Sequence, residues 1–95
     1  MEVNQAIQVA KHYVADIFSD EGVFNIGLEE IEFRSGKWEV TVGFSRKWDR
    51  PPKNPFSVGL EQAQDHAALR RTYKIVEVDD ESGRVTAVSN RSGVM

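Results

Sequence analysis

The first twenty residues place apolar side chains at a helical spacing. Steps of three or four residues keep these side chains on one face of a helix, and mostly polar residues occupy the opposite face. Asn4 is a candidate N-cap and Gly22 a candidate stop, because Asn accepts hydrogen bonds from free backbone N–H groups and Gly tolerates the left-handed backbone after a helix. The pattern predicts one amphipathic helix from about residue 4 to residue 19, with its apolar face formed by Val3, Ile7, Ala10, Val14, Ile17 and Phe18.

From Phe24 onward the apolar period changes from about 3.6 to 2, which is typical of half-buried β-strands. Leu28 leads into residues 30–34, where charged and apolar side chains alternate, and residues 38–45 alternate large apolar with small or polar ones. Ser35-Gly36 lies between the two runs and favours a tight turn, because Gly36 has no Cβ and adopts positive φ without strain. The two runs are therefore predicted to form an antiparallel hairpin.

A second hairpin is predicted from residues 72–78 and 84–88, joined by the turn-forming residues 80–83. The alternation in its first strand is ambiguous, because Tyr73 and Ile75 share one face while Val76 and Val78 share the other. Two explanations remain open: a β-bulge that shifts the register, or a sheet whose two faces are both partly covered.

Together these elements predict an α+β fold, with an N-terminal helix packed on a four-stranded antiparallel sheet. All 95 residues are expected to form a single domain with a long loop at 47–69, which contains the three prolines; residues 59–69 favour one or two helical turns. The predicted core consists of Ile7, Ala10, Val14, Ile17, Leu28, Ile31, Phe33, Trp38, Val40, Val42, Phe44, Tyr73, Ile75, Val85 and Val88.

The start of the long loop is the best candidate for a binding site. Basic and aromatic residues alternate with prolines here, and a proline-stiffened segment loses less conformational entropy on binding. The predicted partner-binding residues are Arg46, Trp48, Arg50 and Phe56. In the alternative interpretation, Trp48 and Phe56 fold back over the sheet and the bases are solvated.

Composition narrows the class of function. The formal net charge of −3 argues against a nucleic-acid partner, although the charge is unevenly distributed, with acids concentrated in residues 1–34 and bases in residues 46–71. There is no cysteine, no apolar run of bilayer length and no signal-peptide pattern at the N-terminus. We therefore expect a cytoplasmic protein with no membrane contact.

No constellation of residues indicates catalysis. The two histidines, His12 and His66, are far apart in sequence and have no third metal ligand at a defined spacing. The acidic clusters at residues 29–32 and 79–81 fit charged strand edges and turns better than an acid–base pair. The sequence thus predicts no enzyme activity, no cofactor and no metal.

Three groups of residues resemble the small cystatin-like α+β domains, and among these the PepSY-like modules. They are Ala6-Ile7 in the helix, Trp38-Glu39-Val40 in a strand, and the closing hairpin from Tyr73 to Val85. The resemblance implies a helix on an antiparallel sheet, and a role in binding or regulating a protease. The sequence departs from the inhibitory motifs of cystatins, because Gln8-Val9 falls in the helix and no matching Pro-Trp loop is present.

Three functions follow as alternatives. The first is a non-enzymatic protein-binding or regulatory domain that uses residues 46–58 and one open face of the sheet. The second is a small-molecule-binding or catalytic domain with a pocket between helix and sheet. The third is a structural module in which a sheet face or edge strand pairs two copies into a homodimer.

Overall fold

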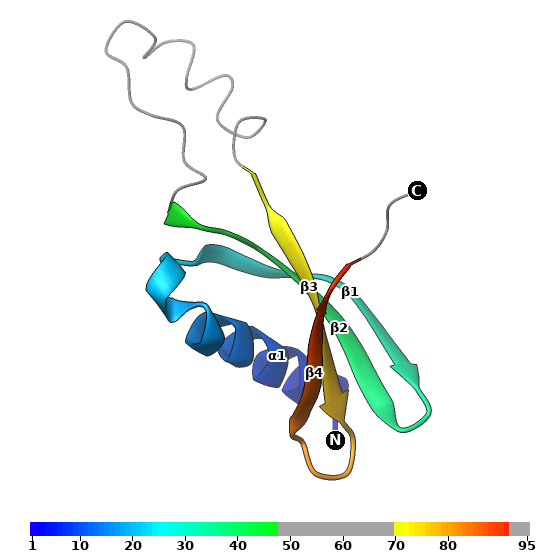
Figure 1. Ribbon diagram of the computed structural model, residues 1–95. Helices are drawn as coiled ribbons and strands as arrows, with labels where there is room; N and C mark the ends of the chain where they lie inside the picture. The colour runs from blue at the N-terminus through cyan, green and yellow to red at the C-terminus, as the bar shows by residue number, and fades with distance from the viewer. Residues whose placement is uncertain (48–69, 92–95) are drawn as a thin grey trace, which may run out of the picture.

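Figure 1 shows the computed structural model, which describes residues 1–47 and 70–91. A helix precedes four strands, as the sequence predicts, and it packs against one face of an open antiparallel sheet. The predicted α+β fold is therefore confirmed. The elements are α1 (Val3–Ile17), the 3₁₀ turn η1 (Ser19–Glu21), β1 (Phe24–Arg34), β2 (Lys37–Ser45), β3 (Thr72–Asp79) and β4 (Val85–Asn90).

The helix begins slightly earlier than predicted. Glu2 is the N-cap residue, and its backbone N–H donates to Gln5 Oε1 at 2.8 Å. Asn4 lies within the first turn, so its predicted capping role is wrong. The helix ends at Ile17, and after η1 the chain turns at Gly22, whose φ of 62° is the left-handed conformation expected of a glycine stop.

The strands follow one another in the order β1-β2-β3-β4, and each neighbouring pair is antiparallel. Ser35 and Gly36 join β1 to β2 with φ values of 53° and 77°, the positive pair typical of a two-residue type I′ turn. The predicted first hairpin is confirmed. Because the order is sequential, β1 and β4 form the two edges of the sheet within the described residues.

The second hairpin is also confirmed. Its first strand, β3, pairs with β2 without a register shift, so the ambiguous pattern reflects two partly covered faces, whereas the bulge lies in β4. The register shifts between Glu77 and Val78, because Glu77 pairs with Ala87 and Val78 pairs with Val85, which leaves one extra residue in β4. Val76 and Val78 are fully buried, whereas Tyr73 and Ile75 are half-buried on the other face.

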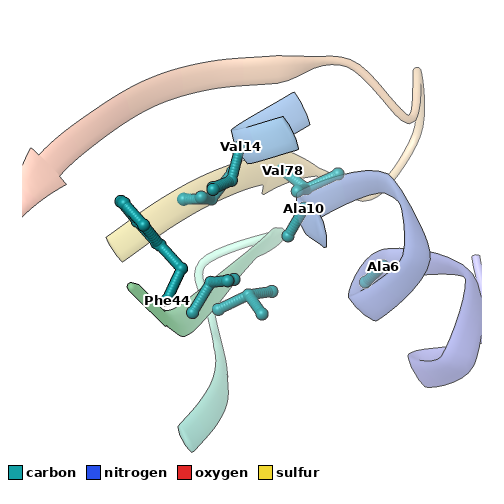
Figure 2. Close-up of a cluster of buried hydrophobic side chains, with 8 residues drawn as sticks. Ala6, Ala10, Val14, Phe44 and Val78 are labelled. Carbon is teal, nitrogen blue, oxygen red and sulfur yellow. The ribbon is translucent and has the colours of Figure 1, made fainter. Parts of the chain in front are cut away.

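The core lies between α1 and the two central strands (Figure 2). Eight side chains here have no exposed surface: Ala6, Ala10, Val14, Val40, Val42, Phe44, Val76 and Val78. Two alanines in the helix allow its backbone to approach the sheet closely, so valine and phenylalanine side chains from β2 and β3 fill the space.

Several predicted core residues lie outside this cluster. Ile17, the last residue of α1, is 45% exposed, and Leu28 and Phe33 on the edge strand β1 are 39% and 52% exposed. Tyr73 and Ile75 were assigned to the wrong face, because alternation in β3 does not reveal which set of residues meets the helix.

None of the helices within residues 1–47 and 70–91 has the length and apolar content that a bilayer crossing requires. Of the predicted loop at 47–69, only its first residue is described; the helical turns predicted at 59–69 lie outside the described residues.

Candidate binding groove on the open sheet face

The sheet face turned away from α1 carries a regular array of polar side chains. Antiparallel pairing aligns residues from neighbouring strands into rows across the sheet. One row consists of Glu30, Thr41, Ile75 and Ser89, and the next consists of Glu32, Glu39, Glu77 and Ala87. We call this surface the open face.

A groove of about 430 Å³ follows these rows. Its floor is formed by the central strands, where Thr41 is only 5% exposed. The volume falls within the roughly 300–1,000 Å³ that ligand sites occupy. The lining residues are Glu30, Glu32, Arg34, Glu39, Thr41, Ile75 and Arg91.

The charges of the groove are only partly compensated. Arg34 Nη2 lies 3.0 Å from Glu32 Oε2 and 3.4 Å from Glu39 Oε1. Glu30, on β1, has no ion pair or side-chain hydrogen bond within the parts of the chain that the structure describes. Arg91, just beyond β4, places its guanidinium 4.8 Å from the ring centroid of Tyr73, and no described carboxylate pairs with it. Two charges of opposite sign, neither compensated within residues 1–47 and 70–91, therefore lie on opposite sides of the groove.

At one end of the open face, three side chains pack over Gly43. A Cβ at this position would lie 2.9 Å from Arg71 Nη2, 3.0 Å from Tyr73 Cε1 and 3.1 Å from Glu29 Cγ. These three side chains therefore lie across β2 in space that only a glycine leaves free. Arg71 and Glu29 also form a loose ion pair, with 3.7 Å between Nη2 and Oε2. The alternating pattern of β2 contains Gly43 but gives no sign of these neighbours.

Of the predicted site residues, only Arg46 is described. Its guanidinium contacts the Glu21 carboxylate through Nε and donates from Nη1 to Thr72 Oγ1 at 2.7 Å. The same group lies 5.5 Å and 5.3 Å from the ring centroids of Phe18 and Phe44. Arg46 thus joins η1, β2 and β3 on the helix side of the sheet, away from the groove.

Trp48, Arg50 and Phe56 lie outside the described residues, so their predicted role stays a prediction. The groove residues were not singled out from the sequence as a binding site. The acidic run 29–32 was the available signal, and it was interpreted as a charged strand edge.

A second polar cluster lies at the turn between β3 and β4, beside the N-terminus (Figure 1). The Met1 ammonium lies 2.8 Å from Asp80 Oδ1, and Trp38 Nε1 donates to the same oxygen at 2.9 Å. The ammonium and then the indole lower the pKa of Asp80, because both stabilise its charged form.

Two neighbouring carboxylates share this behaviour. Hydrogen bonds from Thr86 and then Lys37 lower the pKa of Glu77, and backbone and side-chain hydrogen bonds from Ser82 lower that of Asp79. These contacts close the hairpin, and each carboxylate already has its partners inside the fold.

Within residues 1–47 and 70–91, no three His, Asp or Glu side chains are placed together as metal ligands would be. His12 is exposed on α1, and His66 lies outside the described residues.

No family model matches the chain, and neither the curated proteins nor the solved structures include a match.

Proposed function

We propose that this protein is a non-enzymatic binding or regulatory domain that recognises a protein partner through the groove on its open face. The observation that carries the proposal is a pair of charges, Glu30 and Arg91, that no charged side chain among the described residues compensates and that lie on opposite sides of a groove with a Thr41–Ile75 floor. Fixed strands hold these groups before a partner arrives, which reduces the entropic cost of binding.

The charge pattern favours a polypeptide over nucleic acid. Glu30, Glu32 and Glu39 line the groove together, and three carboxylates repel a phosphate backbone. A protein surface carries side chains of both signs, so it offers a cation to Glu30 and a carboxylate to Arg91. Trp48, Arg50 and Phe56 remain part of the proposal as a second contact, on sequence grounds alone.

The alternative pocket between helix and sheet receives no support from the described residues. Eight side chains at that interface are completely buried, and Ala6 and Ala10 bring α1 close to the strands. The groove that the structure does contain lies on the opposite face.

The resemblance to cystatin-like and PepSY-like domains is also retained as a proposal. One helix on four antiparallel strands fits that resemblance without being specific to it. A cytoplasmic location likewise belongs to the proposal and rests on the absence of cysteine in the sequence.

Affinity capture with groove variants tests the binding function. We expect Arg91→Glu and Ile75→Arg each to abolish capture of a partner that the wild-type protein retains, with an unchanged circular-dichroism spectrum. Arg84→Glu is the matched control, because Arg84 is equally exposed near β4 but does not line the groove. Retention of the partner by both groove variants would contradict the proposed surface.

The triple variant Trp48→Ala, Arg50→Ala and Phe56→Ala tests the second contact in the same assay. Reduced capture would support it, and unchanged capture would leave the groove as the sole proposed surface.

A further inference from the structure

The outer edge of β1 is open to another strand. Residues 30–34 pair one by one with residues 41–37 of β2, and the register shift that interrupts this pairing lies before them, between Leu28 and Glu30. No strand in the described parts of the chain pairs with the other side of β1. An open edge of regular geometry is a template for a further strand.

The backbone groups on this edge follow from the turn. In a two-residue hairpin the pair that flanks the turn, here Arg34 and Lys37, exchanges hydrogen bonds with each other. Bonding then alternates along β1, so Glu32 and Glu30 also bond to β2. The N–H and C=O groups of Ile31 and Phe33 therefore point outward from the sheet.

The side chains of the same stretch differ between the two faces. Ile31 and Phe33 lie on the helix side, where the Phe33 ring is 52% exposed and its centroid is 4.7 Å from that of Trp38. Glu30 and Arg34 lie on the open face, and Glu30 lacks a described partner. The edge thus presents the exposed ring of Phe33 on one face. On the other face it presents the Glu30 carboxylate, which has no described partner, and the Arg34 guanidinium four residues further on.

We propose that β1 pairs antiparallel with β1 of a second copy of this chain, about a two-fold axis at Glu32. Ile31 then lies opposite Phe33 of the second copy, and their outward backbone groups exchange hydrogen bonds. Glu30 lies opposite Arg34 of the second copy. The axis repeats both pairs, as in any isologous interface. The result is a continuous eight-stranded sheet with both helices on one face.

Glu30 distinguishes this register from the others that keep the two faces matched. A shift by two residues in one direction places Glu30 opposite Glu32, and like charges in opposite positions destabilise a strand pair. A shift in the other direction places Glu32 opposite Arg34, which Glu32 already contacts within its own chain, and leaves Glu30 opposite Gly36 in the turn, which provides no cation. Only the proposed register gives each Glu30 an arginine.

One like-charge contact remains at the axis, where Glu32 faces its own copy. Each Glu32 already accepts hydrogen bonds from its own Arg34, at 3.0 Å and 3.3 Å. Glu32→Gln removes the repulsion and should tighten the dimer.

A single-cysteine scan tests the register directly, because the chain contains no cysteine of its own. At the two-fold axis, residue 32 and its copy form a non-hydrogen-bonded pair with Cα atoms about 4.5 Å apart, within the range that a disulfide spans. We expect Glu32→Cys to form a disulfide-linked dimer in a glutathione redox buffer faster than Ile31→Cys or Phe33→Cys. Ser89→Cys, exposed on the opposite edge strand β4, is the matched control.

A charge-swap cycle provides the second measurement, by sedimentation equilibrium. Glu30→Arg and Arg34→Glu each oppose like charges at two symmetric positions, so each should weaken the dimer by roughly tenfold. The double variant restores opposite charges and should recover most of the affinity. A wild-type protein that is monomeric at all concentrations would overturn the proposal, as would fastest cross-linking at residue 31, 33 or 89, or a double variant as weak as the single ones.

The dimer goes beyond the proposed binding function and takes Glu30 from it, because Arg34 of the second copy then pairs with Glu30; Arg91 and Ile75 stay available to the partner, so variants of these two residues separate the proposals. Arg91 and Ile75 lie away from the β1 edge, so their variants test partner capture without changing the edge.

Discussion

The two faces of this sheet are built from alternate residues of the same strands, yet they differ in burial and in charge. On the helix face, Val40, Val42 and Phe44 are completely buried and lack any polar group. On the open face, Glu39 and Thr41 from the same strand line a charged groove. The contrast leads us to expect that the helix face contributes most of the stability, whereas most substitutions on the open face leave the fold intact and so test the proposed recognition.

The largest loss of stability is expected for a substitution on the helix face. Phe44→Ala should lower the free energy of unfolding by about 3–5 kcal/mol, because it leaves a cavity beneath Phe18, whose ring centroid is 5.3 Å away. Urea denaturation measures the change.

Glu39→Ala, on the other face of β2, is the matched control and should stay within about 0.5 kcal/mol of the wild type. If both variants lowered the free energy of unfolding equally, the two faces would contribute equally to stability.

A smaller effect is expected where the open face is tightly packed. Gly43→Ala adds a methyl group 2.9–3.1 Å from Arg71, Tyr73 and Glu29, and overpacking of this kind costs about 1–3 kcal/mol. The flexible ends of Arg71 and Glu29 can move, so we expect a value near the lower limit, measured again in urea.

Gly27→Ala provides the control, because its Cβ would have Arg71 Nη2 at 3.8 Å as its nearest neighbour. A Gly43→Ala protein more stable than the wild type would contradict this, because it would show that Arg71, Tyr73 and Glu29 can pack over an alanine without strain.

The smallest expected effect concerns pH. Contacts in the folded protein lower the pKa values of Glu77, Asp79 and Asp80 below those of the free side chains. A lowered pKa contributes stability that is complete above the unfolded-state pKa and is lost as pH falls through the folded-state pKa. We therefore expect the urea midpoint to fall as pH decreases from about 5 to below 3.

Asp80→Asn should make this fall shallower, because it removes one of the three titrating groups. A midpoint that stays constant over the same pH range would contradict the assigned contacts. All three carboxylates are solvent-accessible, so the effect should also weaken in salt.

The periodicity of apolar residues was sufficient to predict the helix and both hairpins, because an element that buries one face needs apolar residues at its own structural repeat. It could not identify which face of β3 meets α1, since Tyr73, Ile75, Val76 and Val78 are all compatible with burial. The choice depends on the pairing of Val76 with Val40 in β2, a contact between residues distant in sequence.

The candidate site was less predictable than the fold. The groove is lined by Glu30 and Arg34 of β1 and by Arg91 just beyond β4, and only the strand order places these distant residues around one groove. Arg46 illustrates the opposite case. Its basic-aromatic neighbourhood in sequence indicated a binding residue, but its spatial neighbours are Glu21, Thr72 and two phenylalanine rings.

The end of the β2–β3 pair has a consequence for protein engineering. Phe44 pairs with Thr72, Ser45 Oγ donates to the Arg70 carbonyl oxygen at 2.9 Å, and Arg46 donates to Thr72. Residues 44–46 and residues 70–72 are thus held side by side by contacts that do not involve residues 48–69. Foreign sequence grafted between these anchors would carry mainly the entropic cost of its own length, about 0.6 kcal/mol for each doubling. The junction therefore offers an insertion point for epitopes or whole domains on this scaffold.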